Sequence, residues 1–230
     1  FKELSIEYLH TNDILIKVLW SSLNYKDALS AKGHKGITRN YPHTPGVDAA
    51  GIVEKSNNPD IIVGEEVIVT GHDLGMNTNG GFAEFVSVPS NWIVKLPNKL
   101  TLRESMIIGT AGITAAICVN ELIKHGITTD KGKILVTGAT GGVGSMSVAI
   151  LNKIGYNVIA STGKIEETDF LKAIGANEVI HRDEVYDRTE KPLLPRRWAG
   201  AIDTVGGNTL STVFRSTDYH GIVCVLGLVE

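Results

Sequence analysis

Four glycines between residues 138 and 144 have the type and spacing that most clearly indicate chemistry in this 230-residue sequence. They follow an apolar run at residues 133–137 and precede a stretch of small residues typical of a helix. Because glycine has no Cβ, such a loop turns tightly and brings its backbone amides against a pyrophosphate, whose charge the helix N-terminus stabilises. We therefore predict a dinucleotide-binding loop. Its predicted cofactor-binding residues are Thr140, Gly141, Gly142, Val143 and Gly144.

Two other interpretations of this loop were weighed. The spacing is Gly-x-x-Gly-x-x-Gly rather than Gly-x-Gly-x-x-Gly, so a glycine-rich turn that only allows close helix packing stays open. A Walker-type nucleotide loop is excluded, because no Gly-Lys-Ser/Thr follows and the loop contains no lysine. The strand, loop and helix context favours the dinucleotide.

The end of the next predicted strand, residues 157–161, distinguishes NAD from NADP. An NAD site has an Asp or Glu there, about 20 residues after the glycine loop, to bind the ribose 2′-OH. Here Thr162, Gly163 and Lys164 follow the strand, and Arg182 follows the next one. A hydroxyl and cations suit a 2′-phosphate, so these four residues and the cofactor NADP, reduced as NADPH, are predicted. The alternative that Lys164 and Arg182 are only solvated surface charges stays open.

The cysteines and histidines favour a site without metal. Cys118 and Cys224 are the two cysteines and lie 106 positions apart, so no Cys-x-x-Cys site is present. The seven histidines are scattered, with no His-x-x-x-His pair. His72 beside Asp73 is best explained as part of a strand-end loop, and both cysteines as small buried hydrophobes. The predicted metal is none.

The elements that must position these residues differ between the two halves of the chain. Short apolar runs at 14–19, 63–70 and 82–88 predict strands of a small barrel or sandwich, with a loop and short helix at 24–46. In the second half, strands at 133–137, 157–161, 178–180, 201–205 and 222–226 alternate with helices at 143–154, 166–174 and 209–216. This alternation predicts a parallel sheet of right-handed βαβ units, with an exposed insertion at 187–197.

Ligands of open parallel sheets bind at the carboxyl ends of the strands, which adds two candidates. Thr204 and Leu228 lie at the carboxyl ends of the last two predicted strands, so both are predicted to contact the cofactor.

Charge and hydropathy exclude other classes of partner. With 22 basic and 25 acidic residues the formal charge is −3, so nucleic-acid binding is not expected. The longest mostly apolar run, residues 106–119, is shorter than the roughly 18 residues of a membrane helix, so no membrane association is expected. The low cysteine content favours a cytoplasmic protein. The chain starts at Phe1 and ends at Glu230 directly after a predicted strand, and we expect a fragment in which both domains are truncated.

Six sequence stretches carry a resemblance to a known family. Besides the glycine loop they are LNYKDA at 23–28, PGVDAAG at 45–51, GGFAE at 80–84, IGTAGITA at 108–115 and WAGAIDTVG at 198–206. Together they resemble the zinc-independent medium-chain dehydrogenase/reductase superfamily. Within it they are most similar to the bacterial group of acryloyl-CoA reductases and quinone oxidoreductases of the YhdH/YhfP type.

The resemblance implies a fold and an activity. It implies a GroES-like β-rich catalytic domain at 1–110, without its N-terminal strand, and a Rossmann NADP-binding domain at 111–230, without its C-terminal part. The expected activity is NADPH-dependent reduction of the activated C=C bond of acryloyl-CoA or a similar enoyl thioester, by hydride transfer without zinc. Quinone or alkenal reduction is one alternative, and a non-catalytic, crystallin-like NADPH-binding protein is another. The family also implies a homodimer.

The resemblance also places site residues. Tyr25 lies in the segment that resembles the family's cofactor-facing loop, and its phenol, with an ordinary pKa of about 10, is protonated and able to donate at neutral pH. Tyr25 and Asn24 are the catalytic candidates, and Tyr25 and Thr114 are expected near the nicotinamide. A ring that only packs remains the alternative for Tyr25, and a loop turn for Asn24. Asp48 is expected to brace the backbone and Asp27 to cap a short helix.

Overall fold

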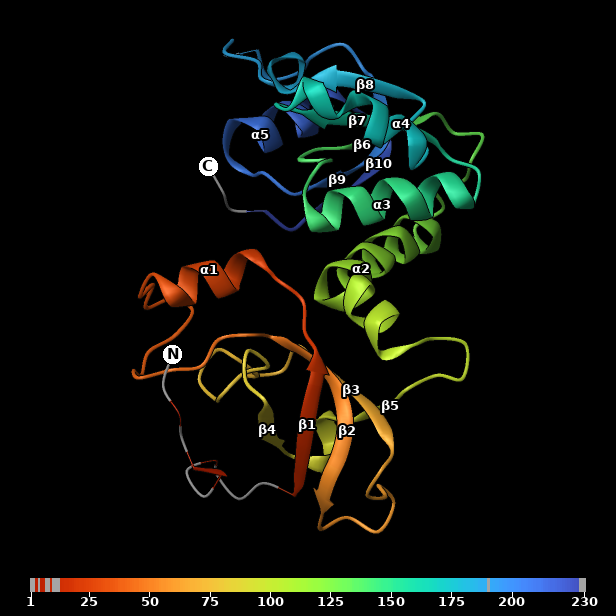
Figure 1. Ribbon diagram of the computed structural model, residues 1–230. Coiled ribbons are helices and arrows are strands. Elements are labelled where there is room, and N and C mark those ends of the chain that lie inside the picture. The colour runs from red at the N-terminus through yellow and green to blue at the C-terminus, as the bar shows by residue number, and fades with distance from the viewer. Residues whose placement is uncertain (1–2, 4, 7–8, 10–12, 190, 228–230) are drawn as a thin grey trace. The chain divides into compact units, whose positions relative to one another are not determined.

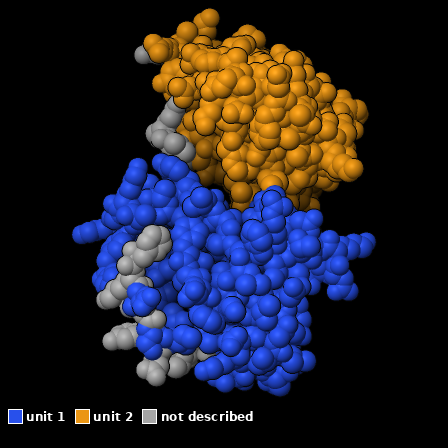
Figure 2. All heavy atoms as spheres, in the orientation of Figure 1, with its two compact units in different colours: residues 1–110 blue, residues 111–230 orange. Residues whose placement is uncertain are grey.

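The computed structural model describes residues 3, 5–6, 9, 13–189 and 191–227. The chain forms two compact units, Phe1–Thr110 and Ala111–Glu230 (Figure 2). Each unit contains one five-stranded sheet with its own core (Figure 1).

The sheet of the first unit is antiparallel, with strand order β4-β1-β2-β3-β5. Its strands are β1 (Ile14–Trp20), β2 (Asp48–Ser56), β3 (Glu66–Thr70), β4 (Phe85–Val88) and β5 (Val94–Lys95). The sequence predicts β1, β3 and β4, with the ranges for β3 and β4 each beginning three residues early. Strand β2, at the centre of the sheet, is not predicted. The reason is its composition: Ala49, Ala50 and Gly51 have weak strand propensity. Gly51 is required there, because a Cβ would overlap the carbonyl oxygen of Lys17 on β1.

Packing of the first unit follows the period-two alternation of β2. Ala49 and Val53 contribute to a buried cluster with Ile14 and Ile16 of β1, whereas Ala50 contributes to a smaller cluster on the other face. The short helix predicted within 24–46 is α1 (Tyr25–Ala31), which begins after Asn24.

Helix α2 (Leu102–Lys124) is long and apolar enough, by length and composition alone, to cross a membrane. The helix is longer than the apolar run at residues 106–119 that the sequence shows, because it extends to both sides of that run. Its backbone, however, leaves helical geometry at Gly109 (φ 48°, ψ −161°). The uninterrupted part at 110–124 rises only about 22 Å, less than the roughly 30 Å of a bilayer core. Buried residues Cys118, Val119 and Leu122 of this part belong to the core of the second unit.

The sheet of the second unit is parallel, with strand order β10-β9-β6-β7-β8. Its strands are β6 (Lys133–Val136), β7 (Asn157–Thr162), β8 (Glu178–His181), β9 (Trp198–Asp203) and β10 (Thr217–Val225). The helices are α3 (Gly142–Lys153), α4 (Thr168–Ala173) and α5 (Gly207–Ser216), with short 3₁₀ helices η3 (Ile165–Glu167) and η4 (Arg182–Val185). The predicted helix at 166–174 is thus divided between η3 and α4, and β9 begins three residues earlier than predicted.

Alternate residues of the parallel strands enter two different cores. Ile134 and Val136 of β6 pack with residues of α2, α3 and α4, whereas Leu135 packs with Val213 of α5 and Val185 of η4. Since successive side chains point to opposite faces, helices cover both faces of the sheet. The predicted combination of a β-rich sheet and a doubly wound parallel sheet is confirmed.

Candidate cofactor-binding site

A pocket of about 640 Å³ lies in the second unit, where β6, β7, β8 and β9 end. It brings together five of the predicted site residues: Thr140, Thr162, Gly163, Lys164 and Arg182. The remaining lining residues are Thr137, Gly138, Ser161, Asp183, Tyr186, Arg188, Val205 and Thr209. The pocket therefore lies at the edge of the sheet where ligands of open parallel sheets bind.

The register of β7 and β8 explains why cations meet there. Thr162 is paired with His181 in the parallel ladder, so Lys164 and Arg182 emerge at the same edge one or two residues later. A Cβ on Gly163 would lie 2.9 Å from Nε of Arg182, so the arginine side chain lies against this glycine.

The charge of the pocket is positive. Lys164, Arg182 and Arg188 line it, and none of them forms an ion pair with a carboxylate of the described part of the chain. Asp183 also lines the pocket, and one of its carboxylate oxygens lies 3.2 Å from Nδ1 of His181. Three cations that have no carboxylate partner among the described residues create a field that suits a phosphate.

Two threonine hydroxyls lie between the glycine loop and β7. The Oγ1 atoms of Thr140 and Thr162 are 3.2 Å apart, and the backbone amide of Lys164 donates to Oγ1 of Thr162 at 3.0 Å. Thr162 is almost fully buried, so its hydroxyl is fixed. The hydroxyl and cations that the sequence predicts at this strand end are thus adjacent.

The four glycines of the loop differ in the reason why glycine is present at each position. Gly138 has φ +58°, and a Cβ there would overlap Oγ1 of Thr204. A Cβ on Gly144 would overlap the carbonyl oxygen of Gly138 and lie 2.7 Å from Cα of Ala139. Gly138 and Gly144 are therefore required by the protein's own packing.

Gly141 and Gly142 are not explained in this way. Both are exposed, neither has a positive φ, and the nearest atom to a Cβ on either is 3.2 Å away. The protein itself leaves almost enough room for a side chain at both positions. Space kept free beside the N-terminus of α3 fits a pyrophosphate that the backbone must approach closely.

Below the pocket, a buried carboxylate ties β9 to β6, and the sequence analysis did not find it. Asp203 accepts from Oγ1 of Thr137 at 2.6 Å and from the amide of Gly206 at 2.8 Å. The hydroxyl of Thr204 donates to the carbonyl of Thr137 at 2.9 Å, so this donor is used within the protein. Val205, and not Thr204, lines the pocket.

Of two further predicted cofactor contacts, the structure describes one. Thr114 is half-buried on α2, one turn after Ala111, whose side chain is the nearest atom to a Cβ built on Gly142. Leu228 lies outside the described residues.

The two catalytic candidates belong to the first unit. Asn24 precedes α1, and its side-chain amide donates to Oδ2 of Asp48 at 2.8 Å. Tyr25 is the first residue of α1 and is 65% exposed. Asp27 accepts from the amide of Asn24 at 2.8 Å, which confirms its role as a helix cap.

Asp48 is fully buried, and it binds side chains as well as the backbone that it was expected to brace. Its carboxylate accepts from the Ser22 hydroxyl, from Asn24, and from both the amide (3.0 Å) and the hydroxyl (2.7 Å) of Thr110. A Cβ on Gly109 would lie 2.9 Å from the same carboxylate. Asp48 therefore joins the segment before α1 to the bend in α2.

Comparison with known proteins identifies the family. Residues 10–98 match the alcohol dehydrogenase GroES-like domain, and residues 142–230 match the zinc-binding dehydrogenase domain. The chain is 41% identical over 227 residues to the acrylyl-CoA reductase AcuI of Ruegeria pomeroyi, covering 99% of this chain and 69% of that protein. The chain belongs to the medium-chain dehydrogenase/reductase family.

Solved structures of this family agree in fold. A YhdH oxidoreductase from Salmonella enterica in complex with NADP has a TM-score of 0.94 and 45% identity, over 99% of this chain and 69% of that one. The Bacillus subtilis protein YhfP with NAD bound has the same TM-score and 49% identity, over the same shares. The first unit thus has the GroES-like fold and the second the Rossmann-type fold.

The second matched domain is that of zinc-binding dehydrogenases, and zinc in proteins is held by His, Cys, Asp or Glu side chains. Within the described part of the chain, no group of three or more His, Cys, Asp or Glu residues lies close enough to hold a metal ion. His72 stacks on Trp92, with ring centroids 5.0 Å apart. Sγ of Cys224 lies 3.5 Å from the carbonyl of Cys118, so the two cysteines meet although they are distant in sequence.

Sequence reasoning missed Tyr186 and Arg188 of the pocket. Arg188 is the second residue of the predicted exposed insertion at 187–197, and Tyr186 directly precedes that insertion, which has no periodicity to place its side chains. The available signal was the charge of that segment, next to a strand end already predicted to bind phosphate.

Proposed function

We propose that this protein is an NADPH-dependent oxidoreductase that reduces the activated C=C bond of acrylyl-CoA or a similar short enoyl thioester without zinc. The observation that supports it most is the set of three cations around the pocket at the ends of β7 and β8, none of which pairs with a carboxylate of the described residues. The likeness to an acrylyl-CoA reductase supports the choice of substrate. In this proposal residues 1–110 are the catalytic domain and residues 111–230 the NADP-binding domain.

The residues of the pocket fit NADPH. The amides around Gly141 and Gly142 approach the pyrophosphate, and Thr162, Lys164 and Arg182 bind the ribose 2′-phosphate. The carboxyl end of β7 has no Asp or Glu that would bind a ribose 2′-OH or repel a 2′-phosphate. A phosphate bound by guanidinium and ammonium groups gains charge-assisted hydrogen bonds that the 2′-OH of NADH does not offer. We therefore expect NADPH to bind more tightly than NADH.

The chemistry divides between the cofactor and the chain. When bound, NADPH supplies a hydride for the β-carbon of the alkene. The exposed hydroxyl of Tyr25 is the proposed hydrogen-bond donor to the substrate, and oriented donors of this kind stabilise developing negative charge at an oxygen. Asn24 uses its amide to bind Asp48, so its proposed part is to fix the start of α1 and hence Tyr25.

An acceptor panel tests the proposal. With full-length protein, we expect NADPH absorbance to fall with acrylyl-CoA and to stay constant with a quinone or an alkenal. Reduction of the quinone or alkenal alone would assign the protein to that chemistry instead. NADPH binding without any turnover would indicate a non-catalytic NADPH-binding protein. Equal affinity for NADH and NADPH would contradict the cofactor assignment.

Tyr25→Phe tests the donor. Loss of one oriented donor is expected to lower kcat with acrylyl-CoA by about 10- to 100-fold, while the dissociation constant of NADPH stays within about twofold. The matched control is Tyr219→Phe, because Tyr219 is 75% exposed and belongs to the second unit. An unchanged kcat for Tyr25→Phe would remove Tyr25 from the chemistry.

The remaining proposals concern the setting. We propose a cytoplasmic homodimer that acts on a small molecule and binds neither nucleic acid nor a membrane. The near-neutral charge supports the part of this proposal that concerns nucleic acid, and the bend in α2 supports the part that concerns a membrane. Light scattering of the full-length protein measures the oligomeric state.

A further inference from the structure

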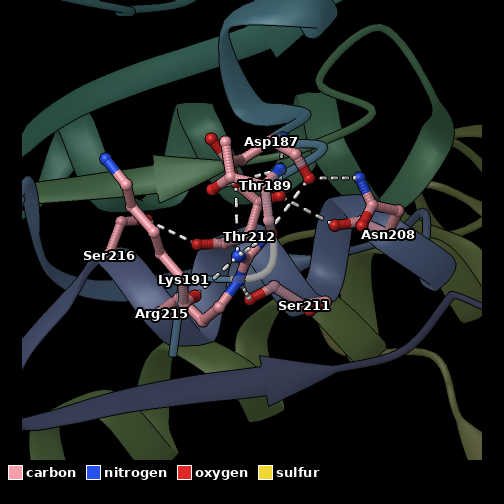
Figure 3. Close-up of polar contacts among 8 residues, drawn as sticks. All are labelled: Asp187, Thr189, Lys191, Asn208, Ser211, Thr212, Arg215 and Ser216. Atoms are coloured by element: carbon pink, nitrogen blue, oxygen red, sulfur yellow. Dashed lines mark hydrogen bonds and ion pairs between the residues drawn. The ribbon is translucent and has the colours of Figure 1, made fainter. Parts of the chain in front are cut away.

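One segment beside the pocket is held by a side chain that does not itself line the pocket. Residues 187–189 and Lys191 belong to the insertion that precedes β9, and Arg215 of α5 binds their backbone (Figure 3). Its Nη1 donates to the carbonyl oxygens of Thr189 at 2.8 Å and Lys191 at 2.9 Å. Its Nη2 donates to the carbonyl of Asp187 at 3.2 Å. One guanidinium thus fixes three carbonyls of an otherwise irregular segment.

Asp187 strengthens the same attachment. Its Oδ1 lies 3.2 Å from Nη1 of Arg215, and its amide donates to Oγ1 of Thr212 at 2.9 Å. The side-chain amide of Asn208 donates to its carbonyl at 2.9 Å. The Thr189 hydroxyl donates to the Asp187 carboxylate at 2.6 Å, and this hydrogen bond lowers the pKa of Asp187 below its ordinary value. The segment is therefore attached to α5 through both backbone and side chain.

The attached segment presents a cation to the pocket. Tyr186 and Arg188 line it, and the guanidinium of Arg188 lies 5.6 Å from the centre of the Tyr186 ring. Arg188 is exposed and forms no ion pair with any described residue. Thr189, whose carbonyl Arg215 binds, is its direct neighbour in the chain. The direction in which Arg188 leaves the backbone is thus set by Arg215.

We propose that Arg188 is a specificity-determining residue that binds the 2′-phosphate of the adenosine ribose, and that Arg215 is the positioning residue that holds it in place. This inference rests on the proposed use of NADPH. A fixed backbone lowers the conformational entropy that a long side chain loses when it binds a ligand. Arginine suits position 215 because two nitrogens of its planar fork reach carbonyls that lie in different directions, whereas lysine has one nitrogen at the end of a flexible stem.

Three variants of the full-length protein test the inference. Arg188→Gln removes the cation, Arg215→Lys keeps the charge but not the fork, and Arg196→Gln is the matched control. Arg196 is exposed, belongs to the same insertion and does not line the pocket. Dissociation constants are measured by calorimetry for NADPH, NADH and 2′,5′-ADP, and the melting temperature checks that each variant folds.

The expected result is a selective loss. Arg188→Gln should raise the dissociation constants of NADPH and 2′,5′-ADP by about tenfold and leave that of NADH unchanged, because only the contact to the phosphate is lost. Arg215→Lys should raise the same two dissociation constants by a smaller factor and speed tryptic cleavage after Arg188. Arg196→Gln should leave all three dissociation constants unchanged.

Two contrary outcomes are distinguishable. If the wild type does not prefer NADPH, the proposed cofactor is wrong and this inference is wrong with it. If the wild type prefers NADPH but Arg188→Gln binds it with unchanged affinity, or loses NADPH and NADH equally, only the role of Arg188 is overturned. An unchanged NADPH affinity in Arg215→Lys overturns the positioning role of Arg215.

Discussion

Asp48→Ala is expected to lower the free energy of unfolding of the first unit by about 3 kcal/mol or more, because several buried or half-buried donors lose one acceptor. These donors are the hydroxyls of Ser22 and Thr110, the side-chain amide of Asn24 and the backbone amide of Thr110. Because a carboxylate accepts all of them and an amide presents only one oxygen, Asp48→Asn should recover only part of the loss.

Urea unfolding followed by circular dichroism measures this effect, and hydrogen exchange assigns it to the first unit. The matched control is Glu54→Ala, on an exposed position of the same strand, where the change should stay within about 0.5 kcal/mol. If Asp48→Ala and Glu54→Ala unfold at the same urea concentration, the Asp48 contacts do not support the bend at Gly109.

Alanine at two glycines of the loop should separate folding from cofactor binding. Gly144→Ala places a Cβ against the backbone of Gly138 and Ala139, which side-chain motion cannot relieve, so a loss of stability of about 1–3 kcal/mol is expected. Gly142→Ala meets only the Cβ of Ala111 at 3.2 Å, so stability should change little.

Of the two substitutions, Gly142→Ala should weaken NADPH binding more. A methyl group there stands where the pyrophosphate must approach the backbone, and we expect the dissociation constant to rise at least about tenfold. Thermal unfolding and calorimetric titration measure the two quantities on the same samples. Unchanged NADPH binding by Gly142→Ala would support the alternative that the glycines only shape a turn.

Much of the fold could be predicted because residue type and hydrophobic periodicity indicate strands and helices. The buried strands β6 and β7 are rich in valine and isoleucine, and α3 begins within the glycine loop, at Gly142. Strand β2 could not be predicted, because its alanines and glycine gain their place from packing between β1 and β3. Gly51 in particular is explained only by the Lys17 carbonyl of the neighbouring strand.

The candidate site divides in the same way. Thr162, Lys164 and Arg182 could be named because a general rule connects the ends of parallel strands with ligand binding. Thr204 follows the same rule, yet its hydroxyl binds the carbonyl of Thr137, and no sequence pattern reveals that partner. Asp203 was missed because a buried carboxylate in an apolar strand is recognised only by its donors.

By itself, the sequence determined the glycine-rich loop, the lack of an acidic residue at the carboxyl end of β7 and the alternation that yields a parallel sheet, because each is a local property of residue type and spacing. Only the tertiary structure decided which glycines the protein's own packing requires, and which cations meet in one pocket. Arg188 and Arg215 are the clearest case. They lie 27 positions apart, and their relation depends on a backbone that passes the end of one helix, which no local pattern encodes.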